Sequence, residues 1–198
     1  MNAVTEVDNI SWDPDWKTYV FIDNTNFSAS MRALGNKKSD FLKLKAYLLD
    51  EMNVMQLYHY SLVIRDGEGF DSLHPVTTWL GYNGFTIKRK EVRPSPGRGR
   101  GSMNMDLAVD AMELAATGKM EHAVLFAGDE DLVRLVEALQ RQAIHVTVIS
   151  GHKTDGGPTV SDALRRQANT FVDLAVLYKE FERVDGPGQS LPDSLTSD

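Results

Sequence analysis

Two stretches decide the fold predicted for this chain: Tyr19-Val20-Phe21-Ile22-Asp23 and Ala123-Val124-Leu125-Phe126-Ala127-Gly128-Asp129-Glu130-Asp131. Each begins as a short, continuous apolar run, the pattern of a strand that is buried on both faces of a parallel sheet. Each ends in aspartate. Because the carboxyl ends of parallel strands meet at one edge, where α/β proteins bind ligands, we expect these acids to lie close together.

Strand and helix patterns alternate along the rest of the chain. Further strands are predicted at 54–64, 85–92 and 144–149, and helices at 27–34, 40–51, 72–82, 105–117, 130–142 and 161–167. This alternation predicts an α/β fold with a mostly parallel, doubly wound sheet and helices on both faces. We expect one domain over residues 17–182, an irregular N-terminal arm over 1–16 and a disordered C-terminal tail over 183–198.

Composition limits the class of protein. With 198 residues, 42% apolar and 25% charged, the chain is typical of a soluble globular domain. The absence of cysteine excludes disulfides and thiolate metal sites, and it fits a cytoplasmic protein. No signal peptide and no apolar run long enough to span a bilayer is visible, so no membrane partner is expected. The sequence leaves homo-oligomer formation open.

The first candidate site residues follow the two apolar runs. Asp23 and Asn26 form an Ile-Asp-x-x-Asn step, which fits either a ligand site or a turn that caps the next helix. Asp129 and Asp131 follow Gly128, whose missing side chain permits a tight turn. One of them could simply cap the helix after it. A cap needs one acid, however, and three occur together, so we favour a functional role.

The predicted helix 105–117 carries further acids. Its apolar residues at helical spacing are predicted to form the buried stripe: Met105, Ala108, Val109, Met112 and Ala116. Asp106, Asp110 and Glu113 then share another face, where they are either a solvated surface or part of the site. We assign Glu113 to the surface. Like charges gathered at one place are unfavourable without a cation, and acidic oxygen sites suit Mg²⁺ or Mn²⁺, so we predict that the metal is held by Asp23, Asp106, Asp110, Asp129 and Asp131.

A basic segment counters the acidic balance of the chain. The formal net charge is −7, yet residues 88–100 carry six basic residues and one acid. Such a segment beside clustered acids is what a site for a phosphate-containing ligand needs, although it could also be an ordinary solvated loop. The predicted phosphate-binding residues are Lys88, Arg89, Lys90, Arg93, Arg98 and Arg100.

The order of these motifs resembles the NYN domains, the LabA-like branch of the PIN-type nucleases. The resemblance rests on the step from Phe21 to Asn26, Asp106-Leu-Ala-Val-Asp110 at the start of a helix, and Gly128-Asp129-Glu-Asp131-Leu132. The downstream segments Ile144–Ser150, Ser161-x-x-Leu164 and Phe171-Val172-Asp173-Leu174 also fit. It covers roughly residues 18–178. Two departures are the missing lysine in Met103-Asn104-Met105-Asp106 and Asn169 at a position where the family often has aspartate.

The resemblance implies a PIN-like Rossmannoid fold and hydrolysis of RNA phosphodiesters. The catalytic acids would be Asp23, Asp106, Asp129 and Asp131, with Asp110 as a supporting or additional ligand and Asn26 as a polar partner that contacts substrate. The hypothesis is therefore an endoribonuclease that uses Mg²⁺ or Mn²⁺ and acts on RNA, single-stranded rather than duplex. A non-catalytic RNA-binding module remains an alternative. A HAD-like phosphatase is less favoured, because its second aspartate would fall at Thr25.

Overall fold

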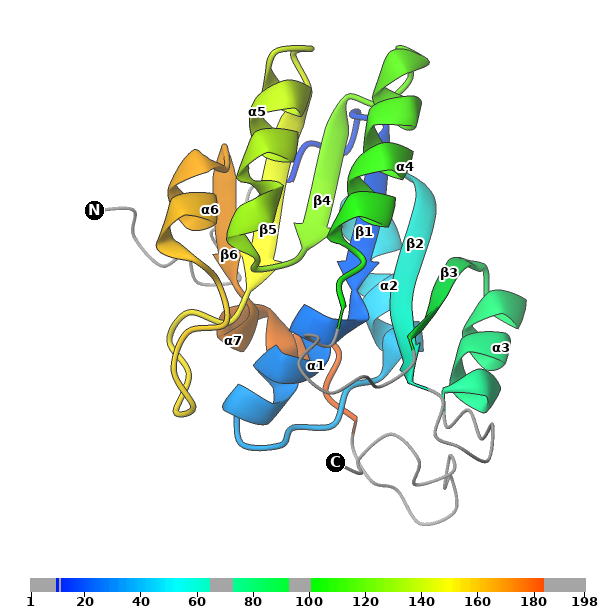
Figure 1. Ribbon diagram of the computed structural model, residues 1–198, viewed down its shortest axis with the longest axis vertical. Helices are drawn as coiled ribbons and strands as arrows, with labels where there is room; N and C mark the ends of the chain where they lie inside the picture. Colours follow the sequence, from blue (N-terminus) through cyan, green and yellow to red (C-terminus); the bar gives the residue numbers. More distant parts are fainter. Residues whose placement is uncertain (1–9, 11, 65–72, 93–100, 184–198) are drawn as a thin grey trace.

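The computed structural model describes residues 10, 12–64, 73–92 and 101–183. In this part of the chain one sheet of parallel strands runs in the order β3-β2-β1-β4-β5-β6 (Figure 1). The strands are β1 (Thr18–Asp23), β2 (Val54–Ile64), β3 (Phe85–Val92), β4 (His122–Phe126), β5 (His145–Ser150) and β6 (Thr170–Asp173). The helices are α1 (Asn24–Ala33), α2 (Phe41–Glu51), α3 (His74–Tyr82), α4 (Asn104–Ala116), α5 (Val133–Gln140), α6 (Asp162–Gln167) and α7 (Leu174–Leu177), with short 3₁₀ turns η2 (Glu130–Leu132) and η3 (Tyr178–Glu180).

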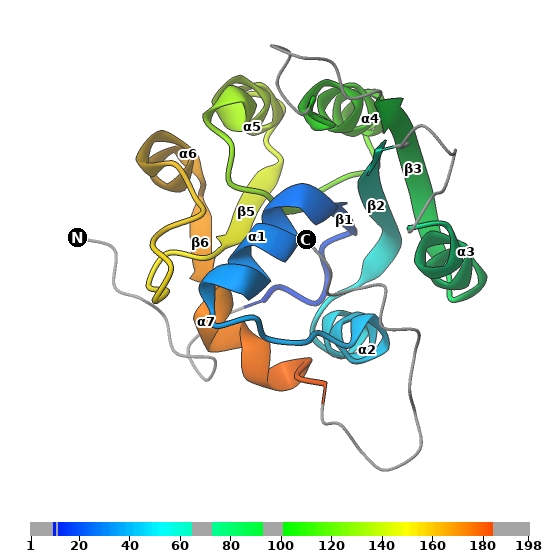
Figure 2. The same cartoon turned by 60° about the horizontal axis from the view of Figure 1, so that its bottom comes forward.

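The helices form a layer on each face of the sheet. Figure 2 shows α4, α5 and α6 over one face, with α2, α3 and α7 on the opposite side. Two apolar clusters correspond to these layers. The first includes Leu107 of α4, Leu135 of α5 and Leu164 of α6. The second includes Leu44 of α2 and Leu80 of α3. The predicted α/β class, with a parallel sheet covered on both faces, is confirmed.

The two apolar runs form neighbouring central strands because they can bury side chains on both faces. Every residue of β1 and of β4 is buried. They pair in parallel, with Ile22 opposite Phe126. The chain reaches β2 and β3 on one side of β1, and β4, β5 and β6 on the other. The strand order therefore changes direction between β1 and β4, which is where open α/β sheets place their ligand sites.

The structure corrects two predictions about helices. The helix expected over 130–142 begins as the 3₁₀ turn η2 and continues as α5. The stripe predicted to be buried on α4 is wrong, because Met105 is 71% exposed and Val109 is 47% exposed. The buried residues of α4 are Asn104, Leu107, Ala111 and Ala115. The alanines lie on the face that packs against the sheet, and the short side chain of alanine allows a helix to approach closely.

Some predictions lie outside the described residues. They concern most of the N-terminal arm, the C-terminal tail from residue 184 and residues 93–100 of the basic segment. The division of the chain into arm, domain and tail stays a prediction. Among the described residues, no helix has the length and apolar character needed to cross a membrane.

Candidate functional site

Asp23 lies at the carboxyl edge between the central strands. Its side chain accepts a hydrogen bond from the backbone N–H of Thr25 at 2.9 Å and so caps α1. Burial raises the pKa of Asp23, and the negative charge of Asp129 raises it further, whereas hydrogen bonds from Thr25 and Asn26 lower it. Asp23 ends β1 and Asp129 follows β4, and these strands are parallel neighbours, so both acids belong to the same edge of the sheet.

Asp129 and Asp131 occupy the turn after β4. The Asp129 carboxylate accepts from the backbone N–H of Asp131 at 3.1 Å and caps η2, while the side chain of Asp131 is exposed. Asp129 therefore has the capping role that was the structural alternative to a functional one. Glu130 and Asp131 are left at the surface beside it. Capping by Asp129 leaves its second carboxylate oxygen without a described protein partner.

The acids of α4 contact basic residues of the edge strand β3. Lys90 Nζ lies 2.8 Å from Asp106 Oδ2, and Lys88 Nζ lies 3.0 Å from Asp110 Oδ1. The hydroxyl of Tyr60 donates to Asp110 Oδ2 at 2.9 Å. Burial raises the pKa of Tyr60, and its hydrogen bond to Asp110 and the charge of Asp110 raise it further, so the phenol stays protonated as the donor. Both oxygens of Asp110 are engaged within the protein.

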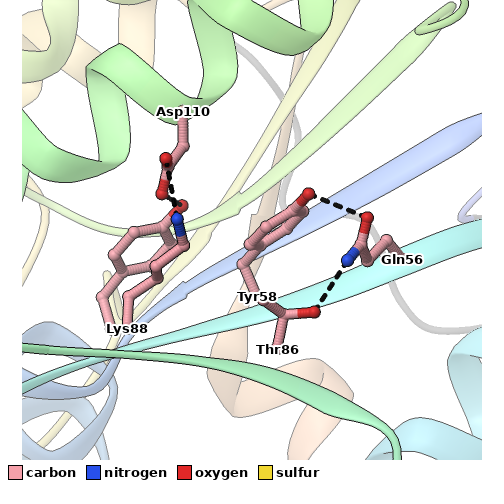
Figure 3. A network of polar contacts seen from close by, with 6 residues as sticks. Gln56, Tyr58, Thr86, Lys88 and Asp110 are labelled. Atoms are coloured by element: carbon pink, nitrogen blue, oxygen red, sulfur yellow. Dashed lines mark hydrogen bonds and ion pairs between the residues drawn. The ribbon is translucent and has the colours of Figure 1, made fainter.

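The register of the sheet explains this arrangement. Lys88 pairs with Tyr60 and Lys90 pairs with Leu62, so both lysines share one face of β3. Arg89, between them, points to the other face. Figure 3 shows Lys88 reaching Asp110 beside a second polar chain, in which Tyr58 donates to Gln56 at 2.8 Å and Gln56 donates to Thr86 at 2.7 Å. The remaining predicted phosphate-binding residues, Arg93, Arg98 and Arg100, lie outside the described residues.

The acidic side chains at this edge are possible ligands of a divalent cation. No group of three or more histidine, aspartate or glutamate side chains that could hold a metal ion occurs among the described residues. The nearby carboxylates of Asp23 and Asp129 still fit Mg²⁺, which commonly takes one or two carboxylates and completes its shell with water and substrate phosphate. Burial is the main cause of the raised pKa of Asp23, and a bound cation would stabilise the charged form of this buried carboxylate.

Asn26 is held by hydrogen bonds to residues that are distant in the sequence. Its amide Nδ2 donates to the backbone carbonyl of Thr159 at 2.7 Å, and its Oδ1 accepts from Ser150 Oγ at 2.8 Å. These bonds connect α1 to the end of β5 and to the segment that follows. Asn26 was predicted to contact substrate, whereas both polar atoms of its amide are used inside the protein. We therefore assign it a positioning role beside Asp23.

Replacing Asn26 by alanine is expected to destabilise the fold by about 2 kcal/mol, because Ser150 and Thr159 would lose partners in a partly buried region. Asn24→Ala is the matched control, since the only side-chain bond described for Asn24 is a long one, at 3.5 Å from Ser28. Its expected effect is under about 0.5 kcal/mol. Urea denaturation measures both. Equal stability of Asn26→Ala and the parent would contradict the positioning role.

Asp173 is a structural residue whose role was not predicted from the sequence. It is 2% exposed and ends β6, where its carboxylate accepts from the backbone N–H groups of His152, Lys153 and Ala175 at 3.2, 2.9 and 3.1 Å. An aspartate directly after an apolar strand was the available indication, the same pattern that singled out Asp23. Three backbone donors satisfy this carboxylate, so Asp173 holds the segment after β5 in place.

Comparison with known structures places the chain in a class defined by its fold. A crystal structure of a protein of unknown function from Vibrio parahaemolyticus superposes with a TM-score of 0.67 over 87% of this chain and 100% of the other, at 20% identity. At that identity the likeness concerns the fold alone. It agrees with the parallel α/β architecture described above.

The family follows from the sequence. The NYN domain model matches residues 17–175, and the chain belongs to this family. It is also 26% identical over 109 residues to the low amplitude and bright protein LabA of Synechococcus elongatus. That match covers 52% of this chain and 56% of LabA, so the chain spans about half the length of this relative. The resemblance to LabA-like NYN domains is confirmed.

Proposed function

We propose that the protein is a divalent-metal-dependent endoribonuclease that hydrolyses phosphodiester bonds of single-stranded RNA at the edge between β1 and β4. The observation that carries the proposal is the buried carboxylate of Asp23, whose pKa is raised by burial and by the nearby charge of Asp129. Membership of the NYN family supports a nuclease rather than another use of paired acids. The chain contains no cysteine that could serve as an alternative nucleophile.

Asp23 and Asp129 would hold the cation, Mg²⁺ or Mn²⁺. Bound there, the ion would lower the pKa of a water molecule and neutralise charge that develops on the scissile phosphate. Asp131 lies beside Asp129 with an exposed side chain and would supply a further oxygen. Asp106 is paired with Lys90 through Oδ2 only, whereas both oxygens of Asp110 are committed, to Lys88 and Tyr60. We therefore rank Asp110 as structural.

The lysines of β3 would attract the RNA backbone. Lys88 and Lys90 share the face of β3 that meets α4, and their ion pairs with Asp110 and Asp106 leave 40% and 46% of their side chains exposed. Arg89 projects from the opposite face and is exposed. Lysine and arginine side chains bind the phosphates of RNA, and such contacts are largely independent of base sequence. Binding is accordingly expected to weaken as salt is raised.

Asp23→Asn and Asp129→Asn are each expected to reduce Mn²⁺-dependent cleavage of labelled single-stranded RNA by about 100-fold or more, since each removes a charged oxygen from the cation site. Asparagine keeps the shape of aspartate and can still cap the following turn. Asp50→Asn, an exposed acid of α2, is the matched control and should cleave like the parent. Undiminished cleavage by both site variants would contradict the nuclease proposal.

A non-catalytic RNA-binding module is the second candidate function. The observation that favours it is the pairing of Lys88 and Lys90 with the α4 acids, which gives those carboxylates a structural use without any metal. RNA that binds to the parent and stays intact with Mg²⁺ and with Mn²⁺ would support this candidate. Release of phosphate from a generic phosphate monoester, without RNA cleavage, would instead favour a phosphatase.

A further inference from the structure

Helix α4 carries a row of apolar side chains that faces solvent. Met105 is 71% exposed and Val109 is 47% exposed, while Met112 is partly buried and Ala116 is exposed. Their spacing of four, three and four residues places all four in one row along the helix, the repeat by which two helices pack against each other along a seam. A contiguous apolar row at the surface marks a site of protein association. We call these four residues the apolar row of α4.

Charged residues of opposite sign lie on the two flanks of the apolar row. Figure 2 shows α4 between β3 on one side and α5 on the other. The flank toward β3 is acidic. It carries Asp106, which lies 2.8 Å from Lys90 of β3, and Glu113, which is exposed and has no ion pair among the described contacts. The flank toward α5 is basic, because α5 presents Arg134 and Arg141 with 82% and 65% of their side chains exposed.

The charges on the two flanks have the same spacing. Positions 106 and 113 are seven residues apart, as are positions 134 and 141, which is two helical turns or about 10 Å. Figure 1 shows α4 and α5 side by side, both running from the carboxyl edge of the sheet toward the opposite edge. Arg134 and Arg141 both contact Glu137, at 2.7 and 3.9 Å. Two positive charges thus share one carboxylate, and the α5 flank keeps a net positive charge.

We propose that the apolar row of α4 is a dimerisation surface and that its partner is a second copy of this chain. The two α4 helices lie parallel about a two-fold axis that runs along them, with row against row. This symmetry brings the acidic flank of each copy opposite the α5 flank of the other, so that Glu113 faces Arg141 of the partner subunit. An antiparallel arrangement would place acidic flank against acidic flank, and the charges therefore select the parallel one. The dimer goes beyond the proposed function and does not rest on it.

Sedimentation equilibrium of the full chain tests the dimer. The parent is expected to sediment with twice the mass of the chain at about 100 µM, a concentration at which interfaces of modest size associate. Val109→Lys places a charge in the middle of the apolar row and should weaken association by about 10-fold or more. Leu49→Lys on α2 is the matched control, because Leu49 is also 47% exposed, and it should associate like the parent.

Reversal of the flanking charges tests the orientation of the two copies. Glu113→Arg and Arg141→Glu are each expected to weaken association by about 10-fold, since each replaces two attractive contacts of the symmetric dimer by repulsive ones. An equimolar mixture of the two variants should form a heterodimer about as stable as the parent dimer, because both contacts then join opposite charges. Variants that had only lost their fold would not associate on mixing.

Three results would overturn the proposal. A parent that stays monomeric at the stated concentration excludes the dimer. A parent dimer that Val109→Lys does not weaken is formed by another surface. A mixture of the two charge variants that stays monomeric excludes the contact between Glu113 and Arg141 of the partner subunit. None of these measurements involves RNA or a metal ion, so the nuclease proposal is tested separately.

Discussion

Gly128→Ala is expected to destabilise the protein by more than about 4 kcal/mol, enough to leave much of the chain unfolded. A Cβ atom at position 128 would lie 2.0 Å from the carbonyl oxygen of Thr159 and 2.3 Å from Asn26 Nδ2. Gly128 does not adopt a positive φ, so the requirement for glycine is close approach rather than backbone strain. The Thr159 oxygen is backbone, and it cannot rotate away as a side chain would.

The surrounding hydrogen bonds prevent either side from receding. Asn26 Nδ2 holds the Thr159 carbonyl at 2.7 Å, and the N–H of Ser161 donates to the carbonyl of Gly128 itself at 2.8 Å. Moving the segment 159–161 away would break both bonds at once. If Gly128 moved instead, the Asp129 carboxylate would shift relative to Asp23, because Asp129 follows Gly128 directly.

Two other glycines are comparison positions at which alanine should have smaller effects on stability. At Gly81, within α3, an added Cβ would meet only Ile87 Cγ1 at an ordinary 3.7 Å, so Gly81→Ala is expected to stabilise the protein by about 0.5 kcal/mol. At Gly151 the nearest atoms belong to side chains, Thr159 Oγ1 at 2.9 Å and Thr154 Cγ2 at 3.0 Å, so an intermediate loss is expected. In urea denaturation, Gly81→Ala should be the most stable of the three variants, Gly151→Ala intermediate and Gly128→Ala the least stable. A fully stable Gly128→Ala protein would contradict the described contact.

The fold was predictable because its central strands are buried on both faces. Runs such as Val20–Ile22 and Val124–Phe126 contain only apolar residues, and this pattern is local. The edge that carries Asp23 and Asp129 follows from parallel pairing alone, so these acids could be placed before any coordinates were known. Strand β2 was predicted with its observed bounds, Val54–Ile64.

What could not be predicted depends on register and on distant partners. The contact of Lys88 with Asp110 requires both the pairing of Lys88 with Tyr60 and the rotation of α4 that buries Leu107. The apolar residues of α4 occupy more than one face, so periodicity alone gave the wrong buried stripe. The role of Asn26 was hidden because its partner Thr159 lies 133 residues away. Sequence spacing carries no information about such a contact.

Acidification is expected to destabilise the fold through two buried histidines. Burial lowers the pKa of His59 to about 4, and burial together with the nearby His145 lowers that of His122 to about 3. Both side chains are 2% exposed. His59 lies beside Phe41, with ring centroids 5.4 Å apart, and its Nε2 has no hydrogen-bond partner among the described residues. His122 is placed between the hydroxyls of Thr18 and Thr147 at 3.2 and 2.9 Å.

Proton linkage gives the direction in which folding stability changes with pH. In the unfolded chain both histidines bind a proton below the ordinary pKa of 6.5, whereas in the folded protein they stay neutral down to about pH 4. Unfolding therefore takes up protons between these values, and stability falls as the pH falls through 6.5. Each histidine costs about 2 kcal/mol at pH 5, or about 4 kcal/mol for the pair. Asp23, whose pKa is raised chiefly by burial, acts in the opposite direction.

The pH dependence of the urea midpoint separates this cause from others. Between pH 7.5 and pH 5 the parent is expected to lose about 4 kcal/mol, and His59→Asn or His122→Asn should each lose about 2 kcal/mol less over the same range, although each starts from a lower stability. His152, for which no comparable burial exists, is the control, and His152→Asn should keep the full loss. An unchanged slope in both buried-site variants would show that other groups take up the protons. His122 begins β4, at the end of the strand away from the carboxyl edge. The proposed RNA cleavage per folded molecule should therefore be unchanged in His122→Asn, which distinguishes a loss of fold from a loss of site.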